Sequence, residues 1–284
     1  METEMNRLFY IPLLLLCHMA IAQDSESTPE YGWQKAGTIT ANLTQASFDN
    51  YIQGGENSTS WQIRLGFTFI NDQERYNWSN TGKFEYGNTQ TGDQIVQKSV
   101  DEIKIESVFT YKTAMILNPF VSFTAETQFT PGYDYSQTPK VQISNFLDPG
   151  FFRESIGLCY KPNDIINARL GAAMKQSVTD QFNTFSDDPN TETVESFKNE
   201  IGAESVIDVN YELSESNQLA SKLELFSNLK AFDEIDVIWD TDVTAQITKL
   251  LAFTFNVKLV YDKDISTKRQ LKQVMGLGIS YHFF

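Results

Sequence analysis

The chain has 284 residues, 13% of them aromatic, and its 37 acidic against 22 basic side chains give a formal net charge of −15. This acidity argues against nucleic-acid binding and against a polybasic membrane-surface protein, because both need clusters of Lys and Arg. The length suits one large domain or two small ones.

The first predicted element is a secretory signal peptide at residues 1–22. An apolar run from Leu8 to Leu16 follows Arg7 and precedes Ala20-Ile21-Ala22, a small-x-small cleavage pattern. The run is too short to cross a bilayer as a helix, which needs about 20 residues. We therefore expect these residues to be removed from the mature protein.

Two details of this segment leave alternatives. Glu2 and Glu4 are unusual in a signal peptide, so a translation start at Met5 is an alternative. Cys17 suggests a lipoprotein, but a lipid-modified Cys normally follows a small residue and a leucine precedes it here. We interpret Cys17 as part of the signal, which leaves Cys159 alone in the mature chain without a disulfide partner.

Beyond residue 35, apolar and polar residues alternate with a period of two, most clearly from Trp61 to Phe69. Such segments predict about twelve β-strands, near residues 36–47, 59–70, 76–88, 99–112, 119–130, 151–160, 165–178, 198–212, 218–230, 235–248, 250–261 and 271–283. The third is the least regular, because Asn80 and Gly82 share its apolar face, which suggests a shifted register or a bulge.

The predicted connections alternate between long and short. Long loops are expected near residues 49–58, 131–146 and 179–197, and short turns at 71–75, 161–164 and 213–217. Short turns at one end and long loops at the other are typical of a transmembrane β-barrel in the outer membrane.

We therefore predict a single up-and-down antiparallel transmembrane barrel with its apolar face outward. Aromatic residues near the strand ends suit the two membrane interfaces: Trp61, Tyr76, Trp78, Tyr111, Tyr160, Tyr261 and Tyr281. The opposite face is predicted to line a lumen with Arg64, Lys104, Glu106, Arg169, Glu204, Asp208, Lys222, Glu224, Asp240, Asp242 and Lys258. A wet lumen tolerates these charges, whereas the dry core of a soluble β-sandwich, the alternative fold, does not.

The expected organisation is a signal peptide at 1–22, a periplasmic segment at 23–35 and an outer-membrane barrel at 36–284. The chain ends in Tyr281-His282-Phe283-Phe284. This ending resembles the C-terminal aromatic signal by which outer-membrane barrels are recognised for insertion, with Phe283 in register and Phe284 as one extra residue. We expect Tyr281, Phe283 and Phe284 to be read by the barrel-assembly machinery.

One segment resembles a known family through Asn42, Gln45, Phe48, Asn50, Tyr51 and Gly54-Gly55-Glu56-Asn57-Ser58. The family comprises uncharacterised Bacteroidota proteins with the domain of unknown function 3078, in which Trp usually stands where this chain has Tyr51. Further matches are Asp101, Thr127-Gln128-Phe129, Gly132-Tyr133, Pro149 and Ser155-Ile156-Gly157. The resemblance implies an outer-membrane barrel and brings no activity or functional residue. Taken alone, Gly54-Gly55 also fits a flexible turn.

The mature chain offers few residues for catalysis or metal binding. Its single His, His282, lies at the end of the last predicted strand, where we expect a structural role. One His and one Cys do not make a zinc site. An acidic loop with Asp187, Asp188 and Glu192 suits Ca²⁺, but it lacks the spacing of an EF-hand, so we interpret it as a solvated loop.

Asp240 and Asp242 share one face of a strand, about 7 Å apart, as a glycosidase pair could. We prefer to interpret them as wall charges that pair with Lys222 or Lys258 on neighbouring strands. The sequence thus predicts no cofactor, no metal and no enzymatic activity.

Two functions remain open. In a narrow channel for small solutes, Asp208, Glu224, Asp240 and Asp242 would favour cations, although charges of both signs could close the lumen. A closed structural or adhesive barrel would instead bind a glycan or protein through its loops, with aromatic contacts from Tyr133, Tyr135, Phe146 and Phe151. The expected partners are outer-membrane lipid, the barrel-assembly machinery and an unidentified small solute or extracellular ligand, without nucleic acid.

Overall fold

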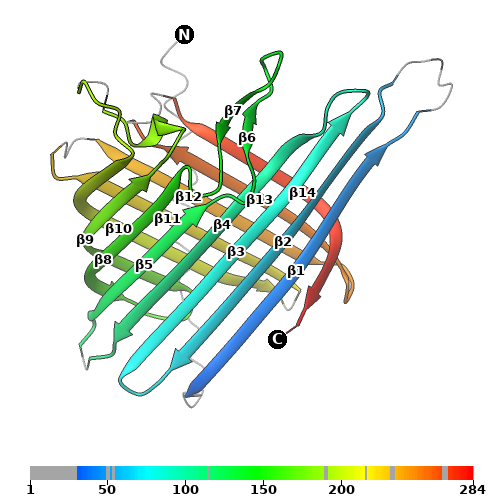
Figure 1. Ribbon diagram of the computed structural model, residues 1–284. Helices are drawn as coiled ribbons and strands as arrows, with labels where there is room; N and C mark the ends of the chain where they lie inside the picture. Colours follow the sequence, from blue (N-terminus) through cyan, green and yellow to red (C-terminus); the bar gives the residue numbers. More distant parts are fainter. Residues whose placement is uncertain are drawn as a thin grey trace, which may run out of the picture. The chain divides into compact units, whose positions relative to one another are not determined.

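The computed structural model describes residues 31–48, 52, 55–113, 115–188, 191–214, 216–230, 234–263 and 268–283. The described residues form twelve long antiparallel strands that close into one barrel (Figure 1). The first and last strands, β1 and β14, complete the closure in a register that runs from Thr38 opposite His282 to Asn42 opposite Gly278. The predicted signal peptide and Phe284 lie outside the described residues.

The barrel strands are β1 (Gly32–Ala46), β2 (Ser58–Asp72), β3 (Tyr76–Thr91), β4 (Gln97–Tyr111), β5 (Asn118–Thr127), β8 (Gly150–Tyr160), β9 (Ile166–Val178), β10 (Phe197–Ser214), β11 (Asn217–Asn228), β12 (Ile235–Gln246), β13 (Leu251–Tyr261) and β14 (Gln270–His282). They confirm the predicted fold class of twelve up-and-down strands. The largest difference is at the start of β1, which begins at Gly32 rather than at residue 36. Within the described part of the chain, no helix has the length and apolar character needed to cross a membrane.

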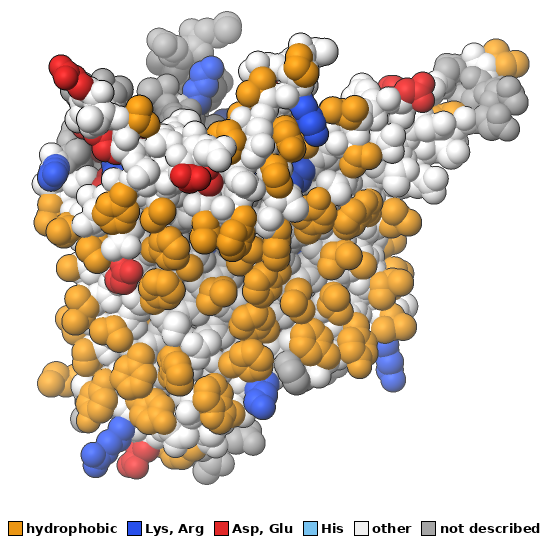
Figure 2. Space-filling view, in the orientation of Figure 1, with side chains coloured by type: hydrophobic (Ala, Val, Ile, Leu, Met, Phe, Trp, Pro, Cys, Tyr) orange, Lys and Arg blue, Asp and Glu red, His pale blue; other side chains and the backbone are white. Residues whose placement is uncertain are grey.

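The barrel wall is apolar outside and charged inside, the reverse of a soluble protein. Ile156 and Leu170 are each 64% exposed, whereas Glu85 is 1% and Arg169 is 4% exposed. Figure 2 shows the apolar side chains as a broad band across the face of the outer wall that is in view. Because successive residues of a strand point to opposite faces, the alternation in the sequence separates the two kinds of side chain.

The connections divide the barrel into a long-loop end and a short-turn end. At the long-loop end, at the top of Figure 1, lie the described residues of the connections 47–57, 92–96, 128–149, 179–196, 229–234 and 262–269. At the short-turn end lie the described residues of the connections 73–75, 112–117, 161–165, 215–216 and 247–250. The alternation is not strict, because 112–117 is longer than 92–96. Aromatic rings gather near the short-turn end, where those of Trp33 and Trp78 lie 6.0 Å apart.

A small hairpin stands at the long-loop end, where the sequence indicates only a loop. Its strands are β6 (Gly132–Asp134) and β7 (Val141–Ser144), which form a separate two-stranded sheet (Figure 1). The Lys140 ammonium lies 3.8 Å from the ring centre of Tyr133 and 5.7 Å from that of Tyr135. These cation–π contacts cover the two rings that the sequence suggests for ligand binding.

The irregular face of β3 has a packing explanation. Gly82 lies on the outer wall beneath the ring of Phe67, and a Cβ at Gly82 would approach that ring to 2.2 Å. Asn80, on the same face, accepts a hydrogen bond from Ser107 Oγ at 2.8 Å. Asn80 and Gly82 therefore lie on the outer face, as the alternation indicates, without a shift at this point. The irregularity in the pairing of β3 lies farther along the strand, at Gly87–Asn88.

Candidate functional site

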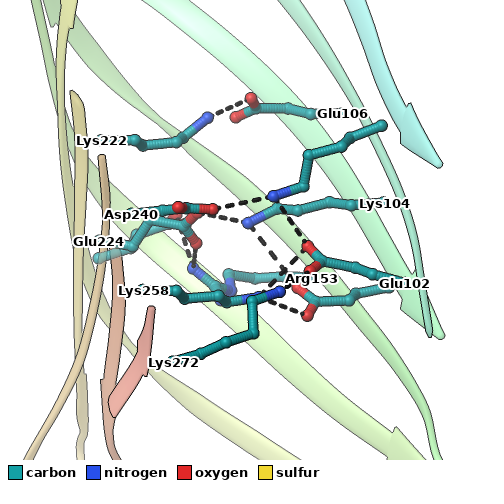
Figure 3. Close-up of polar contacts among 12 residues, drawn as sticks. Glu102, Lys104, Glu106, Arg153, Lys222, Glu224, Asp240, Lys258 and Lys272 are labelled. Atoms are coloured by element: carbon teal, nitrogen blue, oxygen red, sulfur yellow. Dashed lines mark hydrogen bonds and ion pairs between the residues drawn. The ribbon is translucent and has the colours of Figure 1, made fainter. Parts of the chain in front are cut away.

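A layer of paired charges crosses the inside of the barrel, and we name it the ionic septum. Figure 3 shows part of it, with Lys and Arg side chains pointing toward Glu and Asp. Its members are Arg64, Lys83, Glu85, Glu102, Lys104, Glu106, Glu126, Arg153, Arg169, Glu204, Asp208, Lys222, Glu224, Asp240, Asp242, Lys258 and Lys272.

The septum joins opposite walls of the barrel. Lys258 on β13 and Glu126 on β5 stand six places apart in the closed order of twelve strands, yet Nζ and Oε1 lie 3.0 Å apart. Lys104 on β4 reaches Glu224 on β11, with 2.7 Å between Nζ and Oε1. Barrel diameter grows with strand number, and eight strands already leave an interior that side chains just fill. These contacts therefore require a flattened cross-section at the level of the septum.

The structure brings all eleven residues that the sequence assigns to the lumen into this septum. Arg169, for example, lies 2.6 Å from Glu106 and 3.4 Å from Asp208. Of the six further members, the sequence also places Glu126 on the charged face of its strand, and the sequence reasoning missed the other five: Lys83, Glu85, Glu102, Arg153 and Lys272. Each occupies a polar position in the alternation of its strand, which is the signal that could have found them.

Asp240 and Asp242 form their salt bridges across the lumen. The partners suggested by the sequence lie on neighbouring strands: Lys222 and Lys258. The closest ion pairs go to the far wall instead, because Asp240 Oδ2 lies 3.0 Å from Lys83 Nζ and Asp242 Oδ1 lies 2.5 Å from Arg64 Nη1. Lys258, which is opposite Asp240 in register, adds an electrostatic attraction to Asp240. Lys83 and Arg64 also pair with Glu102 and Glu85, so each of these two cations is shared between two carboxylates.

A cavity of about 190 Å³ lies inside the barrel between the septum and the long-loop end. Phe151, Phe226 and Val260 form part of its apolar wall, and Glu126 and Arg153 of the septum also line it. Phe151 is the second residue of β8, so its ring belongs to the lumen. Phe151 thus lies on a strand and not in the preceding loop, and its contact with a ligand stays a prediction.

The long connection between β9 and β10 contributes a ring to this cavity. Phe185, in the short 3-10 helix η1 (Asn183–Phe185), lines the cavity together with Phe151. The two rings meet edge to face, with their centres 5.4 Å apart. This geometry is a favoured one for aromatic pairs and adds to the burial of both rings.

Asp148, from the long connection between β5 and β8, fixes the start of the β9–β10 connection. Its carboxylate accepts hydrogen bonds from the backbone N–H groups of Asp180 (2.9 Å), Gln181 (2.8 Å) and Phe182 (3.3 Å). Burial raises the pKa of this carboxyl, but the three N–H donors favour its charged form more strongly, so the pKa lies below the usual value. The two long connections are thereby tied together beside the cavity.

Groups suited to metal binding do not converge in the part of the chain that the structure describes. There, no three side chains among His, Cys, Asp and Glu form a group that could hold a metal ion. Asp187 of the acidic loop accepts a hydrogen bond from the Glu195 backbone N–H at 3.1 Å. Cys159 is buried, and its Sγ lies 3.0 Å from Asn167 Oδ1.

Comparison with protein families finds one match, to the family described as protein of unknown function (DUF3078), over residues 43–133. The match supports a relationship to this family. It spans the end of β1, all of β2 to β5 and the start of the hairpin, including Asp101 and Gly132-Tyr133. Pro149 and Ser155-Ile156-Gly157 lie beyond it. A comparison with curated proteins finds no match.

Several solved outer-membrane barrels are similar in overall form. The translocator domain of the autotransporter NalP from Neisseria meningitidis has a TM-score of 0.40 at 9% identity, covering 98% of each chain. The NanC porin has a TM-score of 0.40 at 6% identity, over 86% of this chain and 98% of that one. An outer-membrane channel from Pseudomonas putida F1 has a TM-score of 0.39 at 9% identity, over 92% and 98%. Likeness at this level assigns no function, and the barrel is established by its own strand pairing.

Proposed function

We propose that this protein is an outer-membrane β-barrel whose lumen is closed by the ionic septum and which binds its ligand at the long-loop end. The main observation behind this proposal is a barrel wall that is apolar outside and charged inside. On adjacent positions of β9, Leu170 is 64% exposed and Arg169 is 4% exposed. Such a wall is stable where hydrocarbon surrounds it, and a closed barrel leaves no backbone N–H or C=O unpaired there. Export by the signal peptide and recognition of Tyr281 and Phe283 by the barrel-assembly machinery remain parts of this proposal.

Closure is supported by the contacts between opposite walls. An ion that passes along the lumen would have to separate pairs such as Lys258–Glu126 and Lys104–Glu224, whose charged atoms lie 3.0 and 2.7 Å apart. Separating a buried pair leaves two charges without partners, which costs several kcal/mol. The septum therefore opposes a constantly open channel and favours a barrel that acts through binding.

Single-barrel recordings in planar bilayers test closure. We expect almost no conductance from the wild type and a clear rise when Lys258→Ala and Glu126→Ala are combined, because that change removes one of the contacts that join opposite walls. The matched control is Lys161→Ala with Asp164→Ala, an ion pair in the β8–β9 turn, which should stay closed. Steady conductance from the wild type would contradict the proposal.

A gated channel is the second candidate, favoured by the composition of the septum. The contacts across the lumen, such as Arg64–Asp242, join flexible side chains rather than folded backbone segments. A septum of this kind can open without refolding the wall. If Lys258→Ala opens the lumen, the uncovered Glu126 should make it cation-selective, which a reversal potential in a salt gradient would measure. Brief openings of the wild type would favour this candidate.

A further inference from the structure

The cavity at the long-loop end has an apolar half that limits the size of a ligand. Its apolar wall includes Phe151, Phe226, Ile238 and Val260, which come from four strands: β8, β11, β12 and β13. Its volume is about 190 Å³. Since a cavity of about 150 Å³ already holds one benzene ring, this one fits a single ring with a short side chain. Long acyl chains and sugars of several units are too large for it.

The charged side chains of the cavity determine whether it suits a positively or a negatively charged ligand. Each of its cations is already held by at least two carboxylates. Lys175 pairs with Asp236 (2.6 Å), Asp262 (2.8 Å) and Glu200 (3.7 Å), Arg153 with Glu224 (2.9 Å) and Glu204 (3.2 Å), and Lys258 with Glu126 (3.0 Å) and Glu102 (3.3 Å). A ligand anion would have to displace one of these partners. The cations are therefore poor sites for a carboxylate or phosphate.

Two of the four carboxylates that line the cavity, Glu126 and Asp236, retain accepting capacity and are more accessible than its cations. Their side chains are 27% and 19% exposed, against 16% for Arg153, 14% for Lys175 and 11% for Lys258. The other two carboxylates, Glu224 and Asp262, are 6% and 8% exposed. An ionised carboxylate offers about four lone-pair positions to donors. A small cationic donor can thus add to Glu126 or Asp236 without breaking the existing pairs, and it gains charge-assisted hydrogen bonds.

We propose that this cavity binds a small amine, with one aromatic ring or a short branched chain in the apolar half and its ammonium group at Glu126 and Asp236. The inference rests on the proposed function, because it takes the long-loop end of a closed barrel as the ligand-binding end. The ring of Phe185 completes the apolar wall from above, so binding also buries the face that this ring turns to the cavity.

The test is calorimetric titration of the purified full barrel in detergent micelles with three probes of one shape: 2-phenylethylamine, 2-phenylethanol and phenylacetate. Micelles without protein correct for partition of each probe into detergent. We expect saturable binding of the amine, binding of the alcohol at least about tenfold weaker, and none of phenylacetate. Equal or tighter binding of phenylacetate, or no saturable binding of the amine, would overturn the proposal.

Three variants locate the site. Asp236→Asn and Glu126→Gln should each weaken amine binding about tenfold, because each removes one charged acceptor from the cavity. Asp242→Asn is the matched control, since this septum carboxylate does not line the cavity, and it should leave binding unchanged. If Asp242→Asn weakens binding as much as Asp236→Asn, the site is elsewhere and the proposal fails. Conductance of the same preparation separates this inference from the proposed closure of the lumen. A barrel that neither conducts ions nor binds the amine refutes the inference and leaves the closed barrel in place.

Discussion

Glu154 and Glu224 are residues of the same type that lie on opposite faces of the barrel wall. Glu224 is 5% exposed and lies inside, 2.7 Å from Lys104 and 2.9 Å from Arg153. Glu154 lies outside, on β8, where its register neighbours are Phe123 on β5 and Met174 on β9. Among the described residues, nothing donates a hydrogen bond to its buried Oε2.

The difference shows what makes a charge tolerable in this fold. Inside the barrel, each buried carboxylate of the septum has cations within reach, so its desolvation is offset by pairing. Outside, Glu154 follows Phe152 and precedes Ile156 on the outward positions of β8, and it receives no such compensation there. The inner charges therefore stabilise the barrel together, whereas Glu154 is a local cost if hydrocarbon surrounds it.

The largest expected effect comes from removing a paired inner charge. Glu224→Leu would leave Lys104 and Arg153 buried with fewer partners, and we expect the free energy of unfolding to fall by about 3 kcal/mol. Urea unfolding in lipid vesicles, followed by tryptophan fluorescence, measures it. A loss below about 1 kcal/mol would mean that the septum is hydrated well enough to replace the carboxylate.

A second effect concerns Asp148, whose carboxylate is held by backbone N–H groups instead of cations. Asp148→Ala should release the start of the β9–β10 connection and cost about 2 kcal/mol locally, because bonds to a charged acceptor are among the stronger ones. Hydrogen exchange at the N–H groups of Asp180, Gln181 and Phe182 would show it as an exchange rate raised about thirtyfold. Unchanged exchange would refute the role given to Asp148.

The same contact predicts a pH dependence with a definite sign. The pKa of the Asp148 carboxyl is lowered in the folded protein, so its stabilisation is complete above the ordinary value for Asp, about 3.9, and is lost as the pH falls through the lowered pKa. Exchange at Gln181, corrected for its intrinsic pH dependence, should rise as the pH falls below about 4 and through the lowered pKa of Asp148. The Asp148→Ala variant is the control and should show no such rise.

The smallest effect has the opposite sign. Glu154→Leu should stabilise the barrel in lipid by about 1 kcal/mol, because an acidic side chain on the lipid face costs less than the 2–4 kcal/mol of a basic one. The same unfolding assay applies, with Ile156→Leu as a nearly neutral control on the same face. Destabilisation by Glu154→Leu would show that this carboxylate has a partner in the membrane.

The strands could be predicted from sequence because alternation is a local signal. Segments such as Trp61–Phe69 indicate both the strand and which of its residues lie on each face. On β8, Phe152, Ile156 and Leu158 occupy alternate positions, and the same alternation would have placed Glu154 outside. The hairpin β6–β7 was not predicted, because its strands of three and four residues are too short to show a recognisable alternation.

The partners inside the lumen could not be predicted, for a physical reason. Which charges meet depends on the flattening of the barrel, and Asp240 reaches Lys83, 157 positions away in the chain, instead of the neighbouring Lys258. The cavity likewise depends on Phe151, Phe185 and Phe226 meeting from three elements. Only the closed structure brings these rings together.

The central claim is that the outward face of the wall contacts hydrocarbon, and fluorescence quenching by brominated lipids tests it most directly. In a Cys159→Ser background, a thiol-linked fluorophore would be placed by Leu170→Cys on the outer face, or by Val206→Cys on the inner face, where the native residue is 2% exposed. We predict strong quenching at position 170 and little at 206. Equal quenching at both positions, or none at 170, would contradict the inverted barrel.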